Sequence, residues 1–170
     1  GNFQGLDALI DAMHHISNNK EIELIILGDG VAKSSLQQKV AELELNNVSF
    51  FSHQNLVVAK AMIREADLCL VTLAPEIYRS AFPSKAITIL AQGTPLLVCV
   101  EKESSLASMV LDNDLGYHCE ITDSKEISDR LLTAYLERGR DGELRNNCIQ
   151  FYNANFTTTS ILKHWSKLIA

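Results

Sequence analysis

Residues 81–95, which read A-F-P-S-K-A-I-T-I-L-A-Q-G-T-P, decide the fold of this chain. An apolar, β-rich run at 67–73 precedes them, and another at 95–100 follows. This order predicts a strand, a loop, a short helix and a second strand. Pro83 suits the first turn of the helix, because its missing N–H would have no helical partner there. Gly93 suits the position just past the helix end, where a positive φ angle is favourable.

Ser84 and Lys85 then fall at the amino-terminal end of the predicted helix, facing the carboxyl ends of parallel strands. Unpaired backbone N–H groups, the positive end of the helix dipole and the Lys85 ammonium together favour an anion there, and a phosphate fits best. A second interpretation is that Ser84 only caps the helix and Lys85 is a solvated surface side chain. The spacing alone leaves both interpretations open.

The pattern P-S-K-x-x-T-I-L-A-x-G-x-P resembles the donor-site helix in the carboxyl-terminal domain of GT-B glycosyltransferases of the retaining, family-4 type. Within that family it is most similar to the branch that makes bacterial surface polysaccharides. The opening G-N-F-Q-G-L-D at residues 1–7 and G-D-G at 28–30 fall at matching distances, as do Glu101 and the serines at 104–105. The resemblance covers roughly residues 1 to 131.

The composition is that of a globular domain with a large core. Of 170 residues, 46% are apolar and 21% charged, and no apolar run approaches the about 20 residues of a membrane span. The net charge of -6 argues against a nucleic-acid partner, whereas an anionic sugar nucleotide needs only a local basic or dipolar pocket. Cys69, Cys99 and Cys119 lie in apolar runs and are predicted to be buried free thiols of a reducing cytoplasm.

Hydrophobic spacing predicts that helices and strands alternate along the whole chain. Helices are expected at 5–17, 32–45, 56–65, 104–111, 124–137 and about 141–153, and strands at 21–27, 48–51 and 116–121. The fold class is therefore α/β, with a doubly wound, Rossmann-like parallel sheet covered by helices on both faces. A ligand is expected at the carboxyl ends of the strands, near the switch in strand order.

Residues 154–170 are expected to form a carboxyl-terminal amphipathic helix, and Thr157 is a candidate for its cap. Five apolar side chains are predicted on its buried side. They are Ile161, Leu162, Trp165, Leu168 and Ile169.

Gly28, Asp29 and Gly30 form a strand-to-helix turn, where two glycines permit close backbone approach to a ligand. The full dinucleotide fingerprint needs a third glycine and an acidic residue at a later strand end, so a plain tight turn remains an alternative. Lys33 follows in the first turn of the next helix. It could reach a phosphate or simply face solvent.

The resemblance implies further contacts with the donor. Gly1, Asn2 and Gln4 occupy the places where relatives carry an arginine and a lysine against the diphosphate, so backbone N–H groups would have to contribute more here. The loop containing Ser52 and His53 would meet the nucleotide base through backbone groups. Helix capping, by Ser52 or by Asn55, is the alternative.

Many family-4 enzymes have two glutamates eight residues apart, and this chain has Ser80 and Thr88 at those positions. Thr88 would replace the glutamate that holds the ribose hydroxyls, and Glu101 is the candidate that compensates for it. Ser80 would replace the glutamate that faces the donor sugar, and Glu76 or the backbone at 81–82 could take that role. Lys85 and Glu76 are the candidates for a catalytic contribution.

The resemblance therefore implies the donor-binding half of a retaining sugar transferase that uses a nucleotide-diphosphate sugar, expected to be a UDP-sugar. Such enzymes generally need no bound metal, and no cofactor is expected. The partners would be the donor, a glycan or lipid-linked acceptor, and an amino-terminal acceptor domain of the same enzyme outside these 170 residues. The fragment alone would be inactive, and the enzyme would be cytoplasmic or peripheral at the inner face of the cytoplasmic membrane.

Three other functions remain open at this point. Ser80 and Thr88 are compatible with a non-catalytic nucleotide-sugar-binding or scaffold domain. A UDP-sugar epimerase of the same overall fold is the third hypothesis. A nicotinamide dehydrogenase comes last, because the glycine fingerprint is incomplete.

Overall fold

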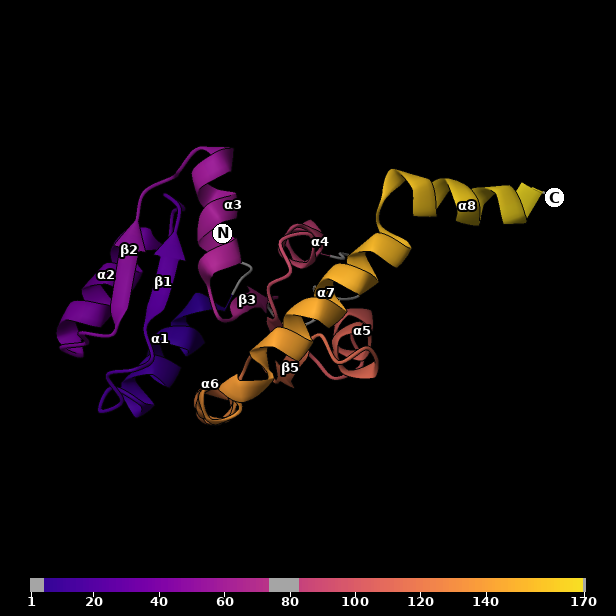
Figure 1. Cartoon of the computed structure of the whole chain (residues 1–170). Helices are drawn as coiled ribbons and strands as arrows, with labels where there is room; N and C mark the ends of the chain where they lie inside the picture. The colour runs from indigo at the N-terminus through magenta and orange to yellow at the C-terminus, as the bar shows by residue number, and fades with distance from the viewer. Residues whose placement is uncertain (1–4, 74–82, 170) are drawn as a thin grey trace.

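The computed structural model describes residues 5–73 and 83–169 as an alternation of helices and short strands (Figure 1). The helices are α1 (Leu6–His15), α2 (Lys33–Glu42), α3 (Leu56–Glu65), α4 (Ser84–Leu90), α5 (Ser105–Asp112), α6 (Ser124–Leu136), the 3₁₀ turn η2 (Arg138–Arg140), α7 (Asp141–Asn155) and α8 (Thr158–Ile169). The strands are β1 (Leu24–Leu27), β2 (Val48–Phe51), β3 (Cys69–Thr72), β4 (Leu96–Cys99) and β5 (Gly116–Cys119). The predicted order is confirmed, and β2 and α3 have the predicted bounds.

All strand pairs are parallel, which confirms the predicted α/β class, but they form two sheets and not one continuous sheet. β1 pairs with β2 in the register Leu24↔Val48. The second sheet has the order β3-β4-β5, with Cys69↔Leu96 and Leu96↔Gly116 in register. Among the described residues no strand joins β1 to β3.

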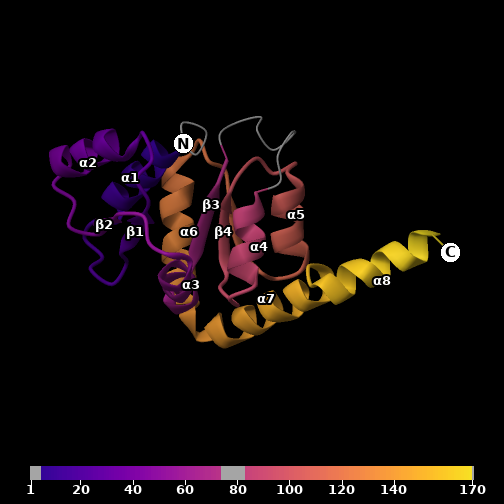
Figure 2. The same cartoon turned by 90° about the horizontal axis from the view of Figure 1, so that it is seen from above.

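The central strand β4 divides the core into two layers, because its side chains alternate between the two faces of the sheet. Leu97 and Cys99 pack into a cluster with residues of α1, α2 and α6. Leu96 and Val98 pack into a second cluster with residues of α4, α5 and α7. Figure 2 shows α1 and α6 on one side of β3 and β4, and α4 and α5 on the other. Helices on both faces are therefore confirmed.

The helix α3, which connects the two sheets, contains no buried residue and is held mainly at its ends. The Asn55 side chain accepts a hydrogen bond from the Val58 N–H at 3.0 Å and so caps its amino-terminal end. At the other end, the Arg145 guanidinium of α7 donates to the carbonyl oxygens of Arg64 at 2.9 Å and Ala66 at 2.6 Å. A cation at a helix carboxyl end is favourable because it faces the negative end of the dipole.

Two glycines occupy positions that other residues would fit poorly. Gly93 follows α4 with φ of 73°, which confirms its predicted place just past the helix end. Gly116 begins β5 with φ of 141°, and a Cβ atom there would lie 2.0 Å from the Leu96 carbonyl oxygen. The close approach of β4 and β5 at this point therefore depends on glycine.

The carboxyl-terminal helix α8 is formed as predicted, but its predicted burial is wrong. The Thr157 hydroxyl accepts the Ser160 N–H at 3.2 Å, as expected of a cap. Yet Ile161, Leu162 and Trp165 are 42%, 63% and 61% exposed, because α8 turns away from α7 and projects from the body (Figures 1 and 2). The predicted burial of Leu168 and Ile169 lies outside the described side chains.

The cysteines are free thiols, as predicted. Cys99 and Cys119 are buried on neighbouring strands with their sulfur atoms 3.5 Å apart, and Cys69 is half-buried. No helix in the described ranges is long and apolar enough to span a membrane.

Candidate functional site

The G-D-G turn lies at the carboxyl end of β1, as the sequence predicted. Gly28 has φ of 137°, a conformation that glycine tolerates best, and its N–H donates to the Phe51 carbonyl at 3.0 Å. Among the described residues, no atom beyond Gly28 and its two chain neighbours lies within 4 Å of the point where a Cβ of Gly28 would be. The backbone is therefore open to close approach from outside.

The carboxylate of Asp29 ties this turn to the loop that follows β2. Its Oδ2 accepts the backbone N–H of His53 at 2.7 Å, and its Oδ1 accepts the Lys33 ammonium at 2.8 Å. Lys33 also reaches the Ser52 hydroxyl at 3.5 Å. Residues predicted separately as nucleotide ligands are thus brought together at the carboxyl ends of β1 and β2.

The same bonds make Asp29 a persistent anion. The hydrogen bond from the His53 backbone, followed by that from Lys33, lowers the pKa of Asp29 below its ordinary value. The bonds also limit what two predicted ligands can offer, since the His53 N–H and the Lys33 ammonium are already engaged.

A second group of predicted residues lies around α4, at the carboxyl end of the other sheet. Pro83 has φ of -72° and ψ of 111° and precedes the first helical residue, so it lies one position earlier than predicted. Ser84 is the first helical residue, so the alternative that Ser84 caps the helix is wrong. Its carbonyl accepts the Thr88 hydroxyl at 3.5 Å.

Lys85 is exposed in the first turn of α4 and forms no ion pair with any residue in the described ranges. The Lys85 ammonium adds a full positive charge beside the backbone N–H groups of this seven-residue helix. Thr88 is also exposed, one helical turn further along the same helix. This group therefore presents a cation and a hydroxyl to solvent.

Glu101 follows β4 in the loop before α5 and is half-buried. Its carbonyl accepts the Ser104 N–H at 2.9 Å, and the Ser104 hydroxyl in turn caps α5 by accepting the Leu106 N–H at 3.2 Å. These bonds fix the Glu101 backbone at the same sheet edge from which the chain leaves β3 toward α4. The predicted position of Glu101 at a strand end is confirmed.

The structure does not test every predicted ligand. Five of them lie outside the described residues: Gly1, Asn2, Gln4, Glu76 and Ser80. Of the others, Lys33, Ser52 and His53 form one group and Ser84, Lys85 and Thr88 the other. No hydrogen bond or ion pair links these two sets of three.

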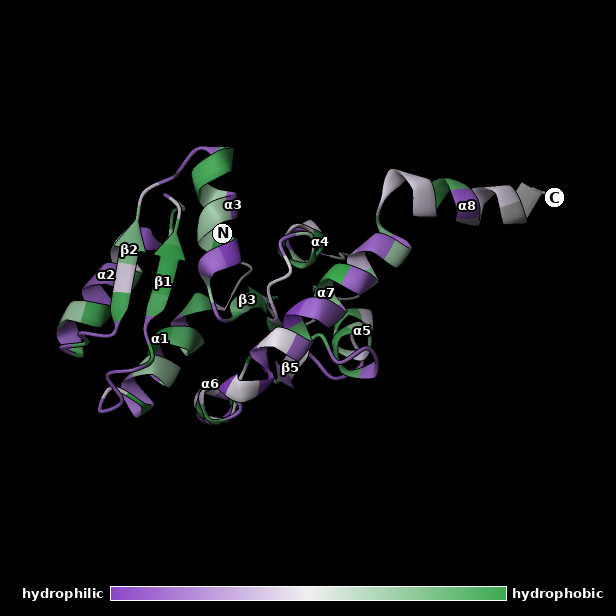
Figure 3. Cartoon of the chain, in the orientation of Figure 1, coloured by the Kyte–Doolittle hydropathy of each residue, from purple (hydrophilic) through white to green (hydrophobic). Residues whose placement is uncertain are grey.

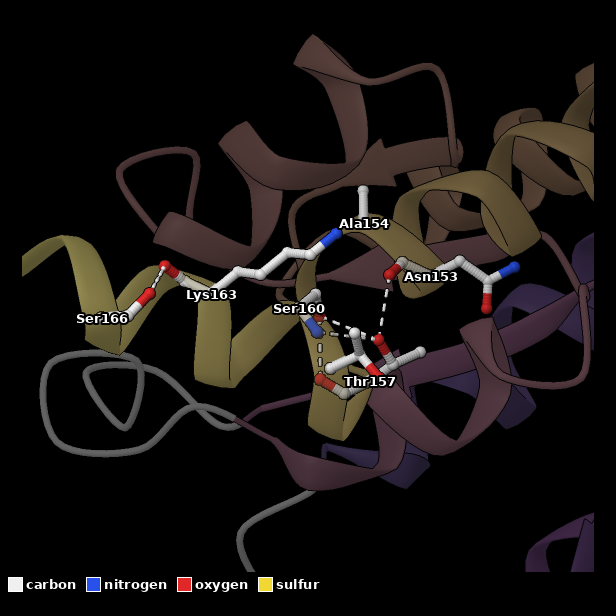
Figure 4. Close-up of a pocket in the computed structure, with 7 residues that line it drawn as sticks. Asn153, Ala154, Thr157, Ser160, Lys163 and Ser166 are labelled. Carbon is white, nitrogen blue, oxygen red and sulfur yellow. Dashed lines mark hydrogen bonds between the residues drawn. The ribbon is translucent and has the colours of Figure 1, made fainter.

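The surface of the described residues has two hollows, one of which includes Lys102, the neighbour of the predicted ligand Glu101. One, of about 360 Å³, is formed at the corner between α7 and α8 by Asn153, Ala154, Thr157, Thr159, Ser160, Lys163 and Ser166. Figure 4 shows that Thr157 and Ser160 bond to each other there, and that Thr157 also bonds to Asn153. The other, of about 400 Å³, follows β5 and includes Tyr117, His118 and Arg130. Neither contains a predicted donor ligand.

No group of three or more His, Cys, Asp or Glu side chains that could hold a metal occurs within 5–73 and 83–169. Asp112 and Asp114 have the Asp-x-Asp spacing, but they lie at the end of α5, just before β5 begins. Arg140 donates to the Asp114 carboxylate at 2.6 Å. These two aspartates are therefore at the opposite end of the strands from the candidate site.

Comparison with known families gives one match, to the family described as glycosyl transferases group 1, over residues 2–153. The chain is 24% identical over 123 residues to the probable glycosyltransferase WbjE of Pseudomonas aeruginosa, covering 72% of this chain and 30% of that protein.

Solved structures with the same fold include Anabaena HepE in complex with UDP, with a TM-score of 0.78 and 17% identity over 99% of this chain and 46% of that one. Sucrose-phosphate synthase of Thermosynechococcus elongatus gives a TM-score of 0.81 and 19% identity, over 99% and 42%. The chain thus spans less than half the length of these relatives.

Proposed function

The chain belongs to the group 1 glycosyl transferases, and on this premise we propose that it is the donor-binding half of a retaining, family-4-type enzyme. The enzyme transfers a sugar from a nucleotide-diphosphate sugar, with a UDP-sugar as the expected donor. The acceptor is a glycan or a lipid-linked sugar in bacterial polysaccharide or lipopolysaccharide biosynthesis. Two relatives support this proposal. One is the probable glycosyltransferase WbjE, and the other is HepE, which has been solved in complex with UDP and with UDP-glucose.

The observation that carries the proposal is the junction made by Asp29 at the carboxyl ends of β1 and β2. It holds an open glycine turn beside the loop of Ser52 and His53, and in parallel α/β sheets this edge is where ligands bind. We assign the nucleoside to this junction. The diphosphate is assigned to Lys85 and the first turn of α4.

In this proposal the catalytic contribution of the chain is electrostatic. The Lys85 ammonium and nearby backbone N–H groups would stabilise the negative charge that develops on the leaving diphosphate. Glu101 would hold the ribose hydroxyls, which Thr88 can bind only through a single neutral hydroxyl group. Glu76 and Ser80 would face the donor sugar.

The proposal includes no metal ion and no resident cofactor. It places the acceptor and any catalytic base on an amino-terminal domain of the same polypeptide, so that residues 1–170 alone bind donor without transferring sugar. It also places the enzyme in the cytoplasm or at the inner face of the cytoplasmic membrane, where donor and lipid-linked acceptor meet.

Ser80 and Thr88 favour a second candidate, a non-catalytic domain that binds a nucleotide sugar. The Thr88 hydroxyl already donates to the Ser84 carbonyl at 3.5 Å, and a neutral hydroxyl is a weaker partner for ribose than a carboxylate. Sugar transfer by the complete polypeptide would exclude this candidate. Interconversion of UDP-sugars without an acceptor would instead indicate an epimerase.

The test is isothermal titration of the chain with UDP, GDP and NAD. UDP is expected to bind best, and Lys85→Ala should weaken it about 10-fold or more, because a charged hydrogen bond contributes about 1.5–3 kcal/mol. Lys20→Ala is the matched control, since Lys20 is exposed before β1 at the opposite end of that strand. Preferential binding of NAD, or equal effects of the two substitutions, would overturn the assignment.

A further inference from the structure

We propose that His118 and Glu120, at the carboxyl end of β5, are positioning residues that hold the loop after β4 so that Glu101 faces the donor. Their side chains bond to this loop on either side of Glu101 and need not touch the substrate themselves. Because Glu101 is assigned to the ribose hydroxyls in the proposed function, the role of these two residues rests on that function.

The backbone pairing between β4 and β5 ends just before Glu101. Cys99 and Cys119 are the last residues in register, and the Val100 N–H donates to the Cys119 carbonyl at 3.1 Å. In the described ranges, no backbone hydrogen bond joins residues 101–104 to β5. The sheet itself therefore stops short of the residue that is assigned to the ribose.

Two side chains at the end of β5 hold the chain where the backbone pairing stops. The Nε2 atom of His118 lies 2.8 Å from the Val100 carbonyl oxygen. Because a carbonyl oxygen can only accept, Nε2 carries a hydrogen and donates it. The Oε1 atom of Glu120 accepts the backbone N–H of Lys102 at 3.1 Å. These two bonds attach the chain one residue before Glu101 and one residue after it.

Glu120 is itself held by the helix that follows. Its backbone N–H donates to Oε2 of Glu126 at 3.0 Å, and Glu126 lies in the first turn of α6. Asp123 caps the same turn by accepting the N–H groups of Lys125 and Glu126. The carboxylate that accepts the Lys102 N–H therefore extends from a fixed backbone, which reduces the entropy lost when that bond forms.

The other side of the loop is fixed by α5. The Glu101 carbonyl accepts the N–H of Ser104, a buried residue whose hydroxyl caps that helix. With β5 attached on one side and α5 on the other, the Glu101 backbone has little freedom left to lose. A group that is already ordered before the ligand arrives contributes more to affinity than one that must be ordered by binding.

The sequence of β5 suits this role. β1 reads L-I-I-L, is hydrophobic along its whole length in Figure 3 and offers no polar side chain. β5 instead reads G-Y-H-C and is followed directly by Glu120. His118 and Glu120 are both half-buried, so water competes less for their bonds than it would at a fully exposed surface.

The experiment compares the affinities of the chain for UDP and 2′-deoxy-UDP by isothermal titration, because their ratio reports the contact with a ribose hydroxyl. A loss of fold stability lowers both affinities alike and leaves the ratio unchanged. Glu101→Ala is expected to reduce the ratio about 10-fold or more, since a carboxylate forms a charged hydrogen bond with a hydroxyl group. Glu120→Ala and His118→Phe should each reduce it about 3-fold or more, because Glu101 remains but is no longer held in place.

Three further variants separate position from charge and from general damage. Glu120→Gln keeps an oxygen that can accept the Lys102 N–H, and His118→Gln keeps an N–H that can donate to the Val100 carbonyl, so both should retain most of the parental ratio. Glu103→Ala is the matched control. Glu103 is exposed in the same loop, carries the same charge and forms neither of the two bonds, so its removal should leave the ratio unchanged.

If Glu101→Ala lowers the ratio but Glu120→Ala and His118→Phe do not, this inference alone is overturned. A decrease in Glu103→Ala as large as that in Glu120→Ala would also overturn it, because the loss would then reflect charge and not position. A parent chain that binds the two nucleotides equally, or binds neither, would overturn the assignment of Glu101 in the proposed function and this inference with it.

Discussion

Replacing Gly116 with alanine tests how closely β4 and β5 approach each other. A Cβ at this position would lie 2.0 Å from the Leu96 carbonyl oxygen and 2.7 Å from its nitrogen, whereas ordinary van der Waals contact begins at 3.4 Å. Both neighbouring atoms are backbone, so no side chain can rotate to make room. The strands would have to separate, which would stretch the bond from the Leu96 N–H to the Leu115 carbonyl, now 3.0 Å long.

Gly28 provides a matched control for backbone strain. Its φ of 137° is close to the 141° of Gly116, but within 5–73 and 83–169 no atom beyond its chain neighbours lies within 4 Å of its Cβ position. Gly28→Ala should therefore lower the free energy of unfolding by the strain alone, about 1–3 kcal/mol. Gly116→Ala should show the same loss plus about 1–3 kcal/mol for the steric clash. Gly139→Ala, in open space without a positive φ, should be neutral or slightly stabilising.

The assay is urea unfolding of the three variants and the parent chain, monitored by circular dichroism. If the dependence of the unfolding free energy on urea concentration is the same in all four chains, a shift of the unfolding midpoint reports a change in stability. The order of stability should be Gly139→Ala, then Gly28→Ala, then Gly116→Ala. Equal losses for Gly28→Ala and Gly116→Ala would refute the close approach of β4 and β5. A large loss for Gly139→Ala would refute the reasoning from local space.

Two further predictions concern titration. Because the pKa of Asp29 is lowered in the folded chain, its ionised form adds stability above its unfolded pKa, and this contribution is lost as pH falls through the folded pKa. The stability difference between the parent and Asp29→Asn, measured by urea midpoints from pH 6 to pH 3, should therefore shrink with acidity. A constant difference would contradict the bonds from the His53 N–H and the Lys33 ammonium to the Asp29 carboxylate. Burial raises the pKa of Cys69 to about 11 and of Cys148 to about 12, so both thiols should resist iodoacetamide at pH 8 until urea unfolds the chain. Rapid labelling of Cys148 in the native chain would show that α7 does not cover it.

Local patterns predicted the elements well because the relevant signals are short-range. Leu56–Glu65 and Val48–Phe51 were predicted with the observed bounds, since Asn55 caps α3 and β2 is a compact apolar run. The predicted strand at 21–27 is shorter in the structure, because pairing with β2 begins only at Leu24. Where strand pairing begins depends on the partner strand, and the hydrophobic pattern of one segment contains no information about its partner.

The site was predictable as a set of loops but not as a network. Strand ends followed by glycine, serine or lysine indicated where ligands bind, and parallel pairing brought Gly28 and Ser52 to one edge. The bridging role of Asp29 was missed, although an aspartate four residues before Lys33 was a visible signal for an ion pair. The exposure of Trp165 was also missed, because an amphipathic pattern shows that a helix has an apolar face without showing what covers it.

The hydrogen bonds from Arg145 to the carboxyl end of α3 have a consequence for the chain as it leaves the ribosome. Arg145 lies 81 residues after the Arg64 carbonyl that it binds, so α3 is synthesised long before the carbonyls of Arg64 and Ala66 can pair with this guanidinium. Synthesis at about 5–20 residues per second makes that interval several seconds. During it, a helix with no buried side chain has its Asn55 cap, the Thr94 hydroxyl that donates to the Ile63 carbonyl at 2.7 Å, and water to stabilise its ends. Completion of the nascent domain therefore waits for α7, and a stalled or truncated product that ends before residue 145 would present an unfinished connection between its two sheets.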